Sequence, residues 1–192
     1  MGSDTATTVT WAWYLLSRNP GAREALTGEL DRVLGGRTPG LDDYARLRRT
    51  EAVVKETRRM RPTVWLDLAV AEEGATLGGE PVPPGTQVWI SPWATHRDPR
   101  RWPEPEESRP ERRLDGAPEA INDHTWFPFG GGTRACLGAR FTMVEAVIVP
   151  ATLGSRFHLD TGDEEIHPTV GPTLRPDRDV LAVTRPVPAP AR

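Results

Sequence analysis

One stretch of the sequence, ending at Gly138, concentrates the residue types that could do chemistry. Cys136 is the only cysteine among 192 residues, so it cannot form an intrachain disulfide or a cysteine-rich zinc site. Three glycines at positions 130–132 precede it, and glycine allows tight turns that let backbone approach a flat or bulky group. Arg134 supplies a planar cation suited to a carboxylate. The thiol is therefore either a nucleophile or soft ligand, or a buried and inert side chain.

The residues after Gly138 are typical of a helix, which would place a Cys136 thiolate at the positive end of the helix dipole. A thiolate, a carboxylate-binding arginine and an approachable glycine loop suit haem, with iron on the sulfur and a propionate on the arginine. The stretch also resembles, position for position, the cysteine-ligand loop of the cytochrome P450 family. The matching positions are Phe129, Gly132, Arg134, Cys136 and Gly138. The resemblance implies that these residues bind haem b (iron protoporphyrin IX) and that Cys136 is the axial ligand of its iron.

The N-terminal residues resemble the oxygen-activation motif of the same family. Gly2, Asp4 and Thr5 match its glycine, acid and hydroxyl. In the family the glycine loosens a long central helix, and the acid and threonine deliver protons during oxygen activation. Ser3 or Asp4 before an apolar-periodic stretch also has the ordinary interpretation of a helix N-cap. The resemblance implies that Asp4 and Thr5 are catalytic.

An acid and an arginine in a predicted helix over residues 51–60 form a second motif. Glu56 and Arg59 are three residues apart, so their side chains meet on one face. Such pairs are usually solvated and contribute little stability. Here they resemble the Glu-x-x-Arg motif of the cytochrome P450 family, which binds a third, distant arginine and holds the cysteine loop in place. Residues 110–112 match the segment that supplies this arginine, which implies a structural role for Glu56, Arg59 and Arg112.

Two further positions bear on haem binding. In the family, an arginine in the first strand of the small sheet often binds a haem propionate, but residues 66–69 contain no arginine. Either Arg134 holds the propionates with partners elsewhere in the chain, or haem is held less firmly. His96 has no neighbouring ligand residues, so we expect it to be a structural hydrogen-bonding residue and not a metal ligand.

The expected fold is mainly α with small β-sheets (α+β), similar to the C-terminal half of the cytochrome P450 fold. Leu26, Leu30, Val33 and Leu34 fall on one face of an amphipathic helix. We expect strands near 157–159, 173–175 and 180–183. We expect a single partial domain over 1–192. It begins with helices over 1–62, the first of them over 1–18, followed by β-hairpins over 63–91 and a meander over 92–128. The cysteine loop and its helix then occupy 129–154, C-terminal strands occupy 155–185, and a tail occupies 186–192.

Composition narrows the class of protein. The net charge of −3 argues against a nucleic-acid partner. No apolar run reaches the roughly 18 residues that a membrane span needs, and the chain does not open with a signal peptide. A single cysteine fits a reducing compartment. These features fit a cytoplasmic enzyme, although they also fit many other proteins.

The resemblance implies a haem-thiolate monooxygenase that inserts one oxygen atom of O₂ into a small hydrophobic organic substrate. Electrons would come from a separate ferredoxin or flavin reductase, with Arg97, Arg100 and Arg101 as basic contacts for an acidic partner. Because the resemblance begins inside the central helix, the chain looks like a fragment whose uncovered apolar faces promote association. One alternative is a truncated, catalytically incompetent remnant. Another is a haem-thiolate peroxygenase or isomerase, against which the acid–hydroxyl pair argues.

Overall fold

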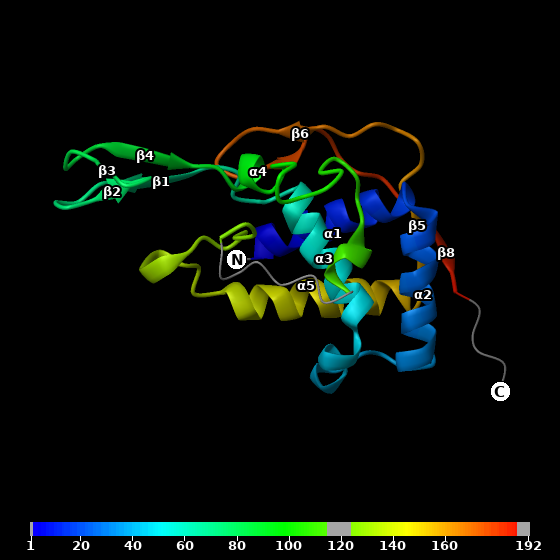
Figure 1. The fold of residues 1–192 in the computed structure, drawn as a ribbon. Coiled ribbons are helices and arrows are strands. Elements are labelled where there is room, and N and C mark those ends of the chain that lie inside the picture. The colour runs from blue at the N-terminus through cyan, green and yellow to red at the C-terminus, as the bar shows by residue number, and fades with distance from the viewer. Residues whose placement is uncertain (1, 115–123, 188–192) are drawn as a thin grey trace.

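Helices form the body of the molecule. The computed structural model describes residues 2–114 and 124–187, and within these ranges the body contains α1 (Gly2–Ser17), α2 (Pro20–Leu34), α3 (Arg48–Met60) and α5 (Ala139–Gly154). The 3-10 helix η1 (Leu41–Arg46) leads from α2 into α3. Figure 1 shows α3 in the middle of the body, with α5 running along one side and α2 standing at the end remote from the cysteine loop. The mixture of helices with small sheets agrees with the predicted fold class.

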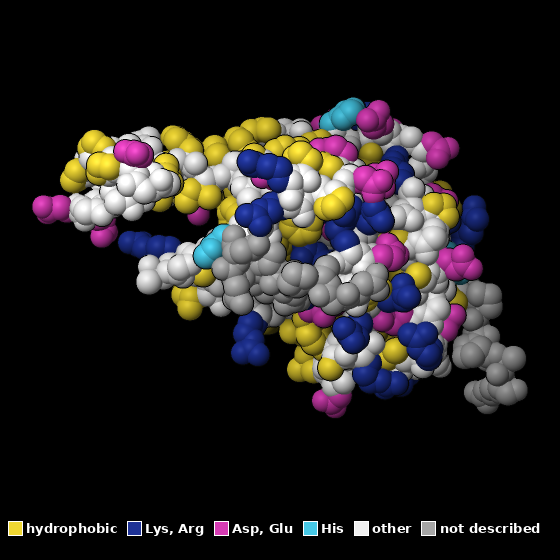
Figure 2. Space-filling view, in the orientation of Figure 1, with side chains coloured by type: hydrophobic (Ala, Val, Ile, Leu, Met, Phe, Trp, Pro, Cys, Tyr) yellow, Lys and Arg dark blue, Asp and Glu magenta, His cyan; other side chains and the backbone are white. Residues whose placement is uncertain are grey.

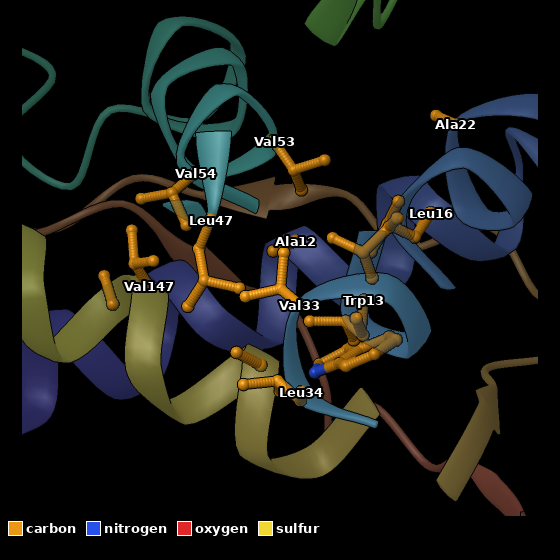
Figure 3. Packing of buried hydrophobic residues seen from close by; sticks show 14 residues of the cluster. Ala12, Trp13, Leu16, Ala22, Val33, Leu34, Leu47, Val53, Val54 and Val147 are labelled. Carbon is orange, nitrogen blue, oxygen red and sulfur yellow. The ribbon is translucent and has the colours of Figure 1, made fainter. Parts of the chain in front are cut away.

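The core lies where α1, α2, α3 and α5 meet, and it explains why these segments are helical. The four apolar residues predicted to share one face of α2 are all buried, which confirms that interpretation. They pack against Trp13 and Leu16 of α1 and against Val147 of α5 (Figure 3). At Gly154 of α5 an added Cβ would lie 2.8 Å from Leu30 Cδ1. Glycine therefore allows α5 to approach its neighbours closely at this point.

The region predicted to form β-hairpins does so and stands apart from the body. β1 (Asp67–Val70) pairs antiparallel with β4 (Gln87–Ile90), and β2 (Thr76–Leu77) pairs with β3 (Glu80–Pro81). We call residues 67–90 the hairpin arm. Figure 1 shows it projecting beyond the helices, and Figure 2 shows hydrophobic side chains gathered over it. Its exposed hydrophobic residues are Leu68, Val70, Leu77, Trp89 and Ile90.

Short strands follow α5. The strand predicted near 157–159 is formed, whereas those predicted over 173–175 and 180–183 are formed only in part. β5 (Phe157–Asp160) pairs with β8 (Val183–Pro186), and β6 (Pro168–Thr169) pairs with β7 (Arg175–Pro176). The predicted strand over 180–183 is wrong for residues 180–182, because Val183 lies opposite Asp160, where β5 ends. The predicted strand over 173–175 is formed only at Arg175, since the backbone of Leu174 instead donates to the Thr63 carbonyl at 2.8 Å.

The meander between the hairpin arm and the cysteine loop has little regular structure among its described residues. It contains the short helix α4 (Pro92–Thr95) and the 3-10 turn η2 (Pro110–Arg113), and a further 3-10 turn, η4 (Gly132–Arg134), lies in the cysteine loop. Ser91 caps α4 by accepting a hydrogen bond from the Ala94 backbone at 3.2 Å. Polar side chains of α3 hold other described residues of the meander, as shown below.

Candidate active site

The glycine-rich loop turns tightly so that Cys136 is presented at its end. Gly130 and Gly132 have φ angles of 73° and 65°, in the left-handed region that favours glycine. The backbone N–H of Cys136 donates to the Phe129 carbonyl at 2.9 Å and closes the loop. Gly138 is the N-cap residue of α5. The thiol of Cys136 is therefore exposed at the entrance to a helix, and it is not a buried, inert core residue.

A cavity of about 260 Å³ joins the cysteine loop to the start of α1 and the end of α3. Four of the predicted site residues line it together, namely Asp4, Phe129, Arg134 and Cys136, whereas Gly132 and Gly138 do not. Asp4 comes from α1 and Cys136 from the loop before α5, so residues far apart in the sequence line one cavity. The other lining residues are Arg58, Thr63, Val64, Asp67, Pro128, Gly130 and Thr142.

Arg58 is a cavity residue that our reading of the sequence missed. It lies two positions after Glu56 on α3, about 200° around the helix, so it faces the opposite side. Its guanidinium carbon lies 4.4 Å from the centre of the Phe129 ring, which is cation–π geometry. Burial lowers the pKa of Arg58 to about 10, and the charges of Asp4 and Cys136 oppose this shift. Arg58 therefore remains a cation at neutral pH. It is buried although it lies opposite Glu56 on the helix, because both faces of α3 are buried here.

The two predicted catalytic residues, Asp4 and Thr5, lie in different environments. Asp4 lines the cavity, but Thr5 is not among the lining residues. Thr5 is buried, and its hydroxyl donates to Glu145 Oε2 at 2.7 Å. Glu145 belongs to α5, and no sequence pattern pointed to it because 140 positions separate it from Thr5. A buried hydroxyl bound to a carboxylate has a fixed orientation, so Glu145 positions the Thr5 side chain.

Glu56, Arg59 and Arg112 lie together, and we call them the Glu56 cluster. Arg59 donates from Nε and Nη2 to the two carboxylate oxygens of Glu56 at 3.0 and 2.9 Å, and neither residue is exposed. Arg112 adds a contact from its Nε to Glu56 Oε1 at 3.1 Å. A bidentate pair of this kind is among the stronger hydrogen-bonded arrangements in proteins. The pair is thus buried and not the solvated surface pair that spacing alone would favour.

The Glu56 cluster reaches the cysteine loop through His96. Arg59 Nη1 donates to the His96 carbonyl at 2.9 Å. The Nε2 atom of His96 in turn accepts a hydrogen bond from the Phe127 backbone at 3.0 Å, two residues before the loop begins. Burial, together with nearby arginines, lowers the pKa of His96 to about 3, so the imidazole is neutral and Nε2 can accept. His96 has the structural hydrogen bonds expected of it.

Comparison with known proteins decides the family. The profile described as Cytochrome P450 matches residues 2–182. The chain belongs to the cytochrome P450 family. It is 41% identical over 172 residues to cyclooctatin synthase of Streptomyces melanosporofaciens, covering 90% of this chain and 36% of that protein. It is 36% identical to putative cytochrome P450 132 of Mycobacterium tuberculosis, covering 94% of this chain and 39% of that protein. It is 33% identical to cyclooctat-9-en-7-ol 5-monooxygenase of S. melanosporofaciens, covering 82% of this chain and 35% of that protein.

This P450 chain spans a little over one third of the length of these relatives. Among the described residues, no helix is both long enough and apolar enough to cross a membrane. Membership in the family implies haem, and the residues around the cavity fit that group. Cys136 offers a thiolate ligand, Arg134 and Arg58 offer cations, and two buried nitrogens of Arg58 lack a hydrogen-bond partner among the described residues.

The arginines expected to meet a redox partner of the P450 differ in their availability. Arg97 is only 9% exposed. Its guanidinium lies 3.4 Å from the centre of the Trp93 ring and is also bound to Glu106. Arg100 is 85% exposed but paired with Asp98. Arg97 therefore supports the meander from within and is not a surface charge.

Proposed function

We propose that this P450 domain forms the haem-thiolate half of a monooxygenase that inserts one oxygen atom of O₂ into a small organic substrate. The observation that carries the proposal is the cavity with Cys136 on the cysteine loop and Asp4 on α1. If haem occupies this cavity, Cys136 would supply a thiolate ligand to its iron, and Asp4 would supply an acid in the same cavity. When bound, haem supplies the activation of O₂, which a thiolate ligand promotes by favouring O–O cleavage.

The residues of this chain have separate roles in the proposal. Cys136 would hold the iron, and Arg134 would bind a carboxylate of the porphyrin. Asp4 lines the cavity and would donate a proton to a group bound there, while Glu145 keeps the hydroxyl of the neighbouring residue, Thr5, oriented. The Glu56 cluster acts at a distance, because it fixes the meander that holds Phe127 through His96. Loss of the cluster would therefore loosen the cysteine loop without touching the reacting groups.

Family membership and the relatives support a proposal for the substrate and the electron donor. The name of cyclooctat-9-en-7-ol 5-monooxygenase states an organic alcohol as substrate and an oxygen insertion as reaction. We propose that the monooxygenase acts on a small, mainly hydrophobic organic molecule. We also propose that a ferredoxin or a flavin reductase delivers the electrons.

The ferrous–CO difference spectrum of the purified chain after reconstitution with haem tests the proposal. We expect a Soret band at the position typical of thiolate ligation, and we expect Cys136→Ser to abolish it. Asp67→Asn is the matched control, because Asp67 lines the same cavity but offers no iron ligand. Absence of haem uptake, or a band typical of a neutral thiol or a histidine ligand, would refute the proposal for this chain.

A second measurement separates a competent enzyme from a remnant. With a redox partner and O₂, a competent domain should consume O₂ in the presence of substrate, and Asp4→Asn should slow this while leaving the ferrous–CO band unchanged. A chain that shows the thiolate band but no consumption of O₂ with any partner would be the catalytically incompetent remnant.

A further inference from the structure

Arg58 presents an unsatisfied edge of its guanidinium in the cavity. The residue is only 2% exposed. Among the described residues, its Nε and Nη2 atoms have no hydrogen-bond partner. A buried cation without a partner is unfavourable, because it has lost its hydration without a compensating contact. The position of Arg58 in the cavity lining indicates that the missing partner is a ligand.

The two unsatisfied atoms specify the kind of ligand. Nε and Nη2 lie on one edge of the guanidinium, and together they match the two oxygens of a carboxylate. Other arginines in this chain use the same edge in this way. Arg59 grips Glu56 through Nε and Nη2, and Arg100 grips Asp98 through the same two atoms. The unsatisfied edge of Arg58 is therefore suited to one carboxylate.

The surroundings of Arg58 keep this edge in place and charged. The Phe129 ring packs against the guanidinium at 4.4 Å, which limits its rotation. The pKa of about 10 keeps the side chain cationic at neutral pH. Asp4 lines the same cavity, but no hydrogen bond joins it to Arg58 among the described residues. The cavity thus holds an oriented cation next to the cysteine loop, and none of the described residues supplies a hydrogen-bond acceptor to its Nε and Nη2 atoms.

We propose that Arg58 binds a carboxylate of the porphyrin through its Nε–H and Nη2–H groups, alongside Arg134. This assignment rests on the proposed function, because it requires haem in the cavity. It identifies the partner elsewhere in the chain that Arg134 needs, since residues 66–69 contain no arginine. A carboxylate on an organic substrate would satisfy the same edge, so the test must separate these two sources.

The test compares haem with haem dimethyl ester, which lacks both free carboxylates. Each is titrated into the wild-type chain and into Arg58→Met and Arg58→Lys, with Soret absorbance as the measure of binding. We expect Arg58→Met to weaken haem binding by about 10- to 100-fold and to leave binding of the ester unchanged. Arg58→Lys keeps the charge but loses the fork, so its affinity for haem should be intermediate.

Arg61→Met is the matched control. Arg61 lies just beyond α3, and burial also lowers its pKa, but it does not line the cavity. Its guanidinium lies 5.1 Å from the centre of the Trp11 ring. Any effect of Arg61→Met should therefore be equal for haem and its ester. Far-UV circular dichroism of each variant shows whether the helices are retained.

Four outcomes would overturn the assignment. If wild type and Arg58→Met bind haem with equal affinity, Arg58 does not contact a carboxylate of the porphyrin. If Arg58→Met loses affinity equally for haem and for the ester, the role of Arg58 is structural. Unchanged haem affinity, with a fatty-acid probe shifting the Soret band of wild type but not of Arg58→Met, would assign the carboxylate to the substrate. If wild type does not take up haem, the proposed function is overturned as well. If wild type takes up haem and Arg58→Met does so equally well, only this assignment is overturned.

Discussion

Replacing Glu56 by glutamine tests whether the Glu56 cluster holds the meander together. The carboxylate accepts from Nε and Nη2 of Arg59, from Nε of Arg112 and from the backbone N–H of Arg109. The amide of glutamine has nearly the same volume, but it carries no charge and only one acceptor oxygen. The substitution therefore leaves Arg59, which is 0% exposed, as an uncompensated buried cation.

The expected cost follows from this burial. Removing one partner of a buried ion pair typically costs about 3–5 kcal/mol, which is a large share of the roughly 5–15 kcal/mol that stabilises a folded domain. With a urea dependence of about 2 kcal/mol per molar, the unfolding midpoint should fall by about 2 M. Arg112→Met should cost less, because the carboxylate keeps its bidentate contact with Arg59.

Urea unfolding followed by tryptophan fluorescence measures both effects, since Trp102 lies 5.4 Å from the Arg59 guanidinium. Asp98→Asn is the control, because Arg100 binds Asp98 with the same bidentate geometry at the surface, where such pairs contribute little. It should not move the midpoint measurably. If Glu56→Gln shifts the midpoint no more than Asp98→Asn does, the reasoning from burial is wrong.

Three further variants test other features by urea unfolding. The pKa of His96 is lowered to about 3 by burial from about 6.5 in an unfolded chain. Between these values only the unfolded state binds the proton, so wild type should lose up to about 1.4 kcal/mol per pH unit as the pH falls, and His96→Gln should remove this component; identical pH profiles would contradict it. Gly154→Ala should lower the free energy of unfolding by about 1–2 kcal/mol, because its Cβ would lie 2.8 Å from Leu30 Cδ1 and 3.1 Å from the Trp13 ring. An unchanged midpoint would show that the neighbouring side chains move to accommodate the methyl group. Thr5→Val should cost about 1–2 kcal/mol by leaving the Glu145 carboxylate without its donor, whereas Thr5→Ser should be nearly neutral; equal losses would exclude the hydrogen bond as the cause.

The sequence was informative where chemistry and spacing are local. The i, i+3 spacing of Glu56 and Arg59 predicted that they meet, and the periodicity of α2 predicted its buried face. That Arg112 joins the pair could be expected only from the family resemblance, because no local pattern links positions 53 or more residues apart. The glycines before Cys136 indicated a tight turn, and two of them have positive φ.

Other parts of the site depend on tertiary packing and could not be predicted. The contact between Thr5 and Glu145 exists because α1 and α5 pack together in the body. The role of Arg58 depends on which face of α3 meets the cavity, and α3 has both faces buried. Strand β8 begins at Val183 because β5 provides a partner only from that point. The apolar run over 180–183 does not indicate this register.

The ion pair of Glu56 and Arg59 also makes two distant parts of the chain open together. Glu56 accepts a hydrogen bond from the backbone N–H of Arg109, and Arg59 donates to the carbonyl of His96, whose ring accepts from the backbone N–H of Phe127. Local opening of the ion pair would therefore release both backbone N–H groups in one event. Amide hydrogen exchange at Arg109 and at Phe127 should report the same opening free energy.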